Sequence, residues 1–108
     1  MGKHLILEVY NVNYELLDDL TAISEVSEAA IKRANMTILN TFTHQFTPHG
    51  VSAIFALAES HVSIHTFPEH GSLTADAYTC GEGNPKIIII ELLKYFNSED
   101  YKLREFYR

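Results

Sequence analysis

The chain has 108 residues, of which 46% are hydrophobic and 20% are charged, a composition typical of one folded domain. Its formal net charge of −6 argues against a protein that binds nucleic acid or an anionic membrane, because both need a basic surface. The sequence has no apolar run of about 18 residues and no signal-peptide pattern. We therefore expect a cytoplasmic protein that does not cross a membrane.

Hydrophobic periodicity predicts two helices and several strands. A helix is expected over residues 16–35, where apolar residues recur near a 3.6-residue period and Lys32 and Arg33 suit the helix C-terminus. A second helix is expected over 86–96, despite four consecutive isoleucines. Strands are predicted at residues 3–10, 36–46, 51–57, 61–67, 73–79 and 101–107, with a turn at 68–71.

This order of elements favours an α+β fold, a two-layer sandwich in which an antiparallel β-sheet carries two helices on one face. Residues 1–108 then form a single domain. Because the helices cannot cover both faces of the sheet, the other face must meet water or a second subunit. The tyrosine-rich end, with Tyr101 and Tyr107, is expected to be an edge strand or an interface.

Cys80 is the single cysteine, which excludes an internal disulfide and a cysteine-rich zinc site. Taken alone, a single cysteine is more often an inert thiol than a reactive one.

Polar residues with catalytic chemistry concentrate in the run AESHVSIHTFPEH at residues 58–70. Its histidines His61, His65 and His70 suggest a metal site, but positions 61 and 65 of a strand are about 13 Å apart, too far to share one ion. Ser60, His65 and Glu69 supply the residue types of a hydrolase, as do Cys80 and His65, yet no nucleophile-elbow motif precedes Ser60. Neither interpretation is specific, and each residue taken singly could be structural.

The segments GKHLILEVY (2–10), FTPHGVSAIFALAESHVSIHTFPEHG (46–71) and DAYTCG (76–81) together closely resemble the prokaryotic-type S-adenosylmethionine decarboxylase proenzymes, which are pyruvoyl-dependent. The resemblance extends over nearly the whole chain.

That resemblance implies that the chain cuts its own Glu59–Ser60 bond, giving a beta chain (1–59) and an alpha chain (60–108). The Ser60 hydroxyl attacks the preceding carbonyl and an ester forms. His65 then removes the Ser60 α-proton, a task suited to imidazole, and residue 60 becomes a pyruvoyl group. Ser52 is expected to donate a hydrogen bond to the tetrahedral intermediate.

The same resemblance implies that S-adenosylmethionine forms a Schiff base with this pyruvoyl group and loses CO2, with no metal and no pyridoxal phosphate. Cys80 is expected to be the proton donor in catalysis. The product would be decarboxylated S-adenosylmethionine, the aminopropyl donor for spermidine biosynthesis.

For substrate binding, the resemblance places Phe46 against the adenine ring and Glu69 on the ribose hydroxyls. Phe67 stands where many family members carry tryptophan, so an aromatic side chain is kept there. His61 and His70 receive no role. A homodimer of processed protomers, with sites near the interface, is also implied.

Two alternatives stay open. A related pyruvoyl-dependent enzyme could act on arginine or ornithine, keeping Ser60, His65 and Cys80 while changing its adenosine contacts. The chain could also be an unprocessed regulatory subunit, although such a copy would have no reason to keep the cleavage residues.

Overall fold

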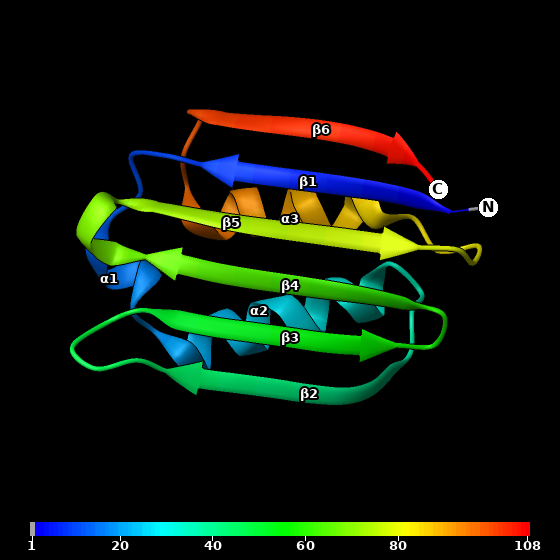
Figure 1. The fold of residues 1–108 in the computed structure, drawn as a ribbon, viewed down its shortest axis with the longest axis horizontal. Coiled ribbons are helices and arrows are strands. Elements are labelled where there is room, and N and C mark those ends of the chain that lie inside the picture. Colours follow the sequence, from blue (N-terminus) through cyan, green and yellow to red (C-terminus); the bar gives the residue numbers. More distant parts are fainter. Residues whose placement is uncertain (1) are drawn as a thin grey trace.

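The structure is a computed structural model that describes residues 2–108. Six strands form one sheet in the order β2-β3-β4-β5-β1-β6, and every neighbouring pair is antiparallel (Figure 1). The strands are β1 (Lys3–Val9), β2 (Ile38–Gln45), β3 (Val51–Leu57), β4 (Ser60–Phe67), β5 (Ser72–Thr79) and β6 (Tyr101–Tyr107). The predicted strands are confirmed, with shifts of one or two residues at their ends.

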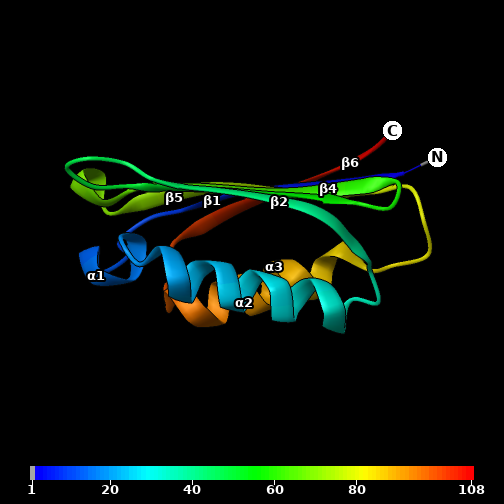
Figure 2. The ribbon, with the colours of Figure 1, turned by 90° about the horizontal axis from the view of Figure 1, so that it is seen from below.

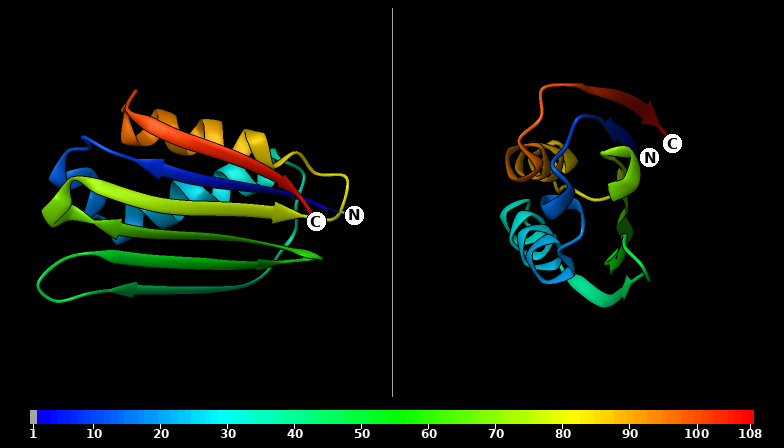
Figure 3. Two further views of the ribbon diagram at one scale, coloured as in Figure 1. Left: turned by 45° about the horizontal axis from the view of Figure 1, so that its top comes forward. Right: turned by 90° about the vertical axis from the view of Figure 1, so that its left-hand side faces the viewer.

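The helices all lie on one face of this sheet, as Figure 2 and the end-on view in Figure 3 show. They are α1 (Tyr14–Leu17), α2 (Leu20–Arg33) and α3 (Pro85–Phe96), with a 3-10 turn, η1 (Pro68–His70), between β4 and β5. The α+β two-layer arrangement predicted from the sequence is therefore confirmed.

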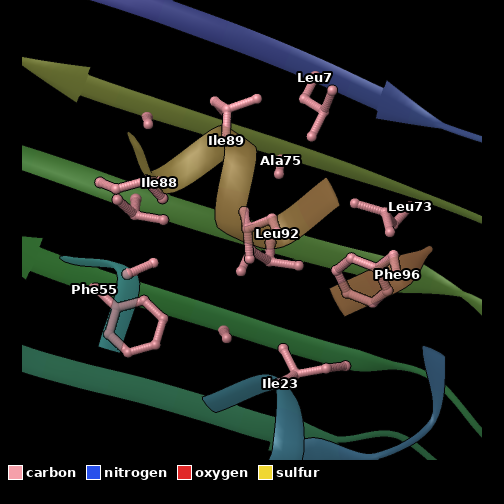
Figure 4. Close-up of a cluster of buried hydrophobic side chains, with 14 of the residues drawn as sticks. Leu7, Ile23, Phe55, Leu73, Ala75, Ile88, Ile89, Leu92 and Phe96 are labelled. Atoms are coloured by element: carbon pink, nitrogen blue, oxygen red, sulfur yellow. The ribbon is translucent and has the colours of Figure 1, made fainter. Parts of the chain in front are cut away.

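The core fills the space between the sheet and the two long helices (Figure 4). Alternate strand residues point into it, which gives β3 and β4 their period of two between buried and more accessible positions. Fully buried large side chains include Phe55, Leu73, Ile88, Leu92 and Phe96. The side chains on one face of every central strand thus pack into the core, and polar side chains gather on the other face.

The prediction of one continuous helix over residues 16–35 is wrong. The structure has a short helix and then α2, with the break at Asp18 and Asp19. The Asp19 carboxylate accepts the Ala22 N–H and caps α2, while Asp18 binds the neighbouring β2–β3 loop. Apolar periodicity does not reveal such a break, because both segments face the same core.

The four isoleucines of α3 are helical because both ends of the segment carry strong helix-terminating signals. Asn84 accepts the Lys86 N–H as N-cap, Pro85 occupies the first turn, and Asn97 closes the helix in a left-handed conformation. These signals outweigh the strand preference of β-branched residues.

The sheet face opposite the helices is not covered by other parts of the described chain (Figure 2). Phe42, Ile54 and Phe106 are large apolar residues on this open face, 58%, 40% and 48% exposed. The strand predicted at the tyrosine-rich end is confirmed as the edge strand β6. Within residues 2–108, no helix is long and apolar enough to span a membrane.

Candidate active site

The predicted site residues gather in two clusters at opposite ends of the sheet. The hairpin cluster lies where β3 turns into β4 and β5 ends, and contains Glu59, Ser60, Thr79 and Cys80. The pocket cluster lies at the far end of β3 and β4 and contains Phe46, His49, Ser52, His65, Phe67 and Glu69.

The hairpin cluster is built on a tight turn. Leu57 pairs with Ser60, so only Ala58 and Glu59 connect the two strands. Glu59 has φ +65°, in the left-handed region that favours glycine. A glutamate held there costs about 1–2 kcal/mol of backbone strain, and this strain lies directly before the Glu59–Ser60 peptide bond.

Cys80 lies beside that peptide bond. Its thiol donates to the Glu59 carbonyl oxygen at 2.7 Å, and its backbone N–H donates to the same oxygen at 3.4 Å. Ser60 Oγ donates to Thr79 Oγ1 at 3.0 Å, on the helix side of the sheet. Two donors on one carbonyl oxygen polarise that carbonyl and can stabilise negative charge that develops on it.

The pocket cluster encloses a cavity of about 350 Å³. Ser52 and His65 are register partners on β3 and β4, and the Ser52 hydroxyl is hydrogen-bonded to His65 Nδ1 at 2.9 Å. Both side chains lie on the open face of the sheet. The pair combines a hydroxyl with an imidazole, a combination suited to proton transfer.

Aromatic and acidic side chains complete the cavity wall. Phe46 is 48% exposed, and the His44 ring packs edge-on against it with ring centroids 4.4 Å apart. Phe67 lines the same cavity, and Glu69 lies across it on η1, 3.2 Å from His49 Nε2. The cavity therefore offers aromatic faces for a flat ring and a carboxylate for hydroxyl groups.

The structure does not bring Ser60 and His65 together within one chain. They are five residues apart on β4, about 16 Å along the strand, and they point to opposite faces. Ser52 is likewise in the pocket cluster, away from the Glu59–Ser60 bond of its own chain. Glu69 and the aromatic residues Phe46 and Phe67, in contrast, meet around one cavity, as a shared ligand requires.

His61 lies in neither cluster and does not approach His65 or His70. Its Nε2 is 3.0 Å from Asp76 Oδ2, and His4 Nε2 is 2.7 Å from the same oxygen. Arg108 lies 3.4 Å from His4 Nδ1; because guanidinium only donates, that nitrogen accepts and Nε2 carries the proton. In this tautomer the His4 nitrogen that faces Asp76 has no lone pair for a metal ion.

Asp76 is the centre of this polar group on the open face. Burial by itself raises the pKa of the Asp76 carboxyl, but hydrogen bonds from Ser63, His4 and His61 outweigh it and lower that pKa below its ordinary value. Asp76 therefore stays ionised as the acceptor of three donors.

Sequence reasoning missed His49 and Thr79. Neither carries a motif of its own, and each gains its position from a neighbour distant in sequence: Glu69 for His49 and Ser60 for Thr79. The alternation of β5 could have placed Thr79 on the inner face, but the pairing of β4 with β5 that brings it to Ser60 is a tertiary property.

The comparisons with known proteins agree with one another. Residues 3–108 match the sequence model of the family described as S-adenosylmethionine decarboxylase. An S-adenosylmethionine decarboxylase proenzyme from Prochlorococcus marinus (strain MIT 9313) is 40% identical, over 100% of this chain and 87% of the relative. The crystal structure of the adenosylmethionine decarboxylase from Aquifex aeolicus VF5 superposes with a TM-score of 0.93 at 34% identity, covering 100% of this chain and 90% of that one.

The relatives differ in length from this chain. The S-adenosylmethionine decarboxylase proenzyme of Aquifex aeolicus (strain VF5) is 45% identical, over 76% of this chain and 61% of that relative. The relative from Sulfurihydrogenibium sp. (strain YO3AOP1) is 43% identical, and the match again covers 61% of its length. With a family match over residues 3–108 and a shared fold, the chain belongs to the S-adenosylmethionine decarboxylase family.

Proposed function

We propose that this protein is a self-processing decarboxylase that converts S-adenosylmethionine to decarboxylated S-adenosylmethionine and CO2. The observation that carries the proposal is the Glu59 carbonyl oxygen, which accepts both donors of Cys80 in a strained turn directly before Ser60. This is the carbonyl that the Ser60 hydroxyl must attack if the chain cuts itself into residues 1–59 and 60–108.

Processing uses groups of the chain itself. Attack by Ser60 Oγ moves the Glu59 acyl group from nitrogen to oxygen, and the Cys80 donors stabilise the negative charge on the carbonyl oxygen. Loss of the Ser60 α-proton to His65 then expels the Glu59 carboxylate. Hydrolysis of the resulting dehydroalanine consumes one water, releases one ammonia and leaves a pyruvoyl group at residue 60. Ser52, hydrogen-bonded to His65, supports this proton transfer.

Decarboxylation rests on the same position. Once formed, the pyruvoyl group supplies an electron sink, which accepts the electron pair of the carbon–carbon bond that breaks when the carboxyl group leaves as CO2. Neither a metal nor pyridoxal phosphate is then needed. The Cys80 thiol, next to residue 60 across the β4–β5 pair, returns a proton to the substrate carbon. The residues around position 60 fit this group, because three donors gather there. They are the Thr79 hydroxyl, the Cys80 thiol and the Cys80 backbone N–H.

The pocket cluster is the proposed binding site for the adenosine part of the substrate. Phe46 and Phe67 supply aromatic faces for adenine, and Glu69 accepts hydrogens from the ribose hydroxyls. The cavity of about 350 Å³ is within the size range of small-ligand sites.

A homodimer reconciles the two clusters. Because His65 lies about 16 Å from Ser60 along its own strand, a second copy is needed to bring a His65 and a Ser52 near residue 60. The open sheet face, with Phe42, Ile54 and Phe106 exposed, supports pairing through this surface. A two-fold axis between the sheets would set the hairpin cluster of one protomer against the pocket cluster of its partner.

An intact mass spectrum under denaturing conditions tests the processing step. We expect two fragments split after Glu59, with the second lighter than its serine form by one ammonia and reducible by borohydride. A Ser60→Ala chain should stay uncut. A single stable 12.2 kDa wild-type species would instead indicate the regulatory subunit.

A carbon dioxide release assay then tests the substrate. We expect turnover of S-adenosylmethionine and none of arginine or ornithine, because neither amino acid offers a ring for Phe46 or a diol for Glu69. Turnover of arginine or ornithine alone would overturn the proposed substrate while leaving self-processing intact.

A further inference from the structure

His49 occupies a loop that is fixed from both sides. Asp18 Oδ1 accepts the Gly50 N–H at 2.9 Å and the Gln45 side-chain amide at 2.8 Å. The Phe46 N–H donates to the Gly50 carbonyl at 2.8 Å, closing the loop between β2 and β3. His49, directly before Gly50, is therefore held by contacts on either side of it.

The His49 ring lies between Tyr14 and Glu69. It packs edge-on against Tyr14, with ring centroids 5.6 Å apart and an interplanar angle of 83°. Its Nε2 is 3.2 Å from Glu69 Oε1, and only 25% of the His49 side chain is exposed. The turn that carries Glu69 is tied to the same region, because the Val12 N–H donates to the Gly71 carbonyl at 2.9 Å.

Glu69 needs this support. Its side chain is 46% exposed and starts from a three-residue turn, so its rotamer is not fixed by burial. The close contact between His49 Nε2 and Glu69 Oε1 holds the carboxylate across the cavity and leaves Oε2 available as an acceptor. A carboxylate preset in this way loses less conformational entropy when a ligand hydroxyl binds to it.

We infer that His49 is a positioning residue that orients Glu69 toward the vicinal hydroxyls of a ribose, and so sets the preference of this cavity for a ribonucleoside. The inference rests on the proposed function, because it takes the Glu69 cavity as the nucleoside site. His49 acts through Glu69, because the contacts of its ring are with Tyr14 and Glu69.

The test measures steady-state kinetics of the processed wild-type protein and two variants. His49→Leu removes this contact with Glu69, and we expect KM for S-adenosylmethionine to rise about tenfold with kcat unchanged. His49→Gln keeps an N–H donor near the position of Nε2, and we expect it to restore most of the wild-type KM.

A substrate lacking a ribose hydroxyl separates positioning from folding. Wild-type protein should prefer S-adenosylmethionine over its 2′-deoxy analogue, because a carboxylate preset for hydroxyls is left unpaired by the analogue. In His49→Leu this preference should collapse toward unity. His70→Leu is the matched control. It changes an exposed histidine in the turn that carries Glu69, and it should leave both KM and the ribose preference as in the wild type.

The outcomes distinguish a failure of the proposed function from a failure of the role assigned to His49. Wild-type protein that does not turn over S-adenosylmethionine overturns the proposed function and this inference with it. Wild-type turnover combined with an unchanged KM or unchanged ribose preference in His49→Leu overturns the role of His49 alone. A His49→Leu chain that stays uncut also overturns that role. The same holds if kcat falls in His49→Leu and His49→Gln does not restore KM.

Discussion

Ser60 and His65 lie five positions apart on the same strand, β4, yet their side chains point to opposite faces of the sheet. The Ser60 hydroxyl meets Thr79 on the helix side, while His65 meets Ser52 on the open side. No rotamer change spans about 16 Å of strand. A reaction that needs both residues therefore needs two chains.

Mixed dimers test this directly. A Ser60→Ala chain supplies His65, and a His65→Ala chain supplies Ser60, so we expect neither to be cut when expressed alone. Co-expressed with distinguishable tags, the two should form dimers with one complete site, and the His65→Ala chain should be cut. Mass spectrometry of the purified mixture reads this out.

The matched control pairs the His65→Ala chain with a double variant, Ser60→Ala/His65→Ala, which offers no His65 to its partner. Cleavage in this control, or its absence from the complementing pair, would argue that processing does not use a histidine from the second copy.

Replacing Cys80 should separate processing from catalysis. Cys80→Ala keeps the backbone N–H that donates to the Glu59 carbonyl, so we expect the chain to be cut, although more slowly than the wild type. Without the thiol as proton donor, kcat should fall by about a hundredfold or more. Time-resolved mass spectrometry and the CO2 assay measure the two effects, and full turnover would remove Cys80 from the catalytic role.

The strained turn predicts an unusual stabilising substitution. Glu59→Gly, made in the uncut Ser60→Ala background, should raise the free energy of unfolding by about 1 kcal/mol, because glycine adopts φ +65° without steric cost. Ala58→Gly in the same turn is the control. Ala58 has no positive φ, so there glycine only adds unfolded-state entropy and should destabilise. Urea unfolding compares them; equal effects at both positions would contradict strain at Glu59.

Asp76 predicts a pH dependence of stability. Its pKa is lower in the folded chain than in the unfolded chain, so its ionised form stabilises the fold above the ordinary pKa of 3.8. This stabilisation is lost as the pH falls through the lowered pKa. Asp76→Asn should therefore be less stable than the wild type at pH 7, with the difference shrinking below about pH 4.

Urea titrations at several pH values measure that difference. Glu25→Gln, which removes an exposed carboxylate on α2, is the control. A wild-type advantage over Asp76→Asn that stays constant down to pH 3 would contradict the hydrogen-bonded role of the carboxylate.

Much of the fold could be predicted from the sequence, whereas the roles that it assigns to site residues stay predictions. Alternation in segments such as 51–57, and capping residues such as Asn84, act locally, so they are visible in the order of amino acids. The family resemblance also names Phe46, Phe67 and Glu69, which line one cavity in the structure, and their role in binding stays a prediction. Apolar periodicity does not predict the break at Asp18, whose carboxylate accepts the Gly50 N–H of a loop 32 residues away.

What the sequence by itself determined is the chemistry present: a Glu59–Ser60 bond, one cysteine, the side chains of Ser52 and His65, and the two periodicities that give a sheet with helices on one face. Only the tertiary structure decided which of these groups meet. Strand register places the Cys80 donors on the Glu59 carbonyl and sends Ser60 and His65 to opposite faces. The physical reason is that successive side chains alternate across a strand, while the partner of each residue depends on pairing with strands distant in the chain.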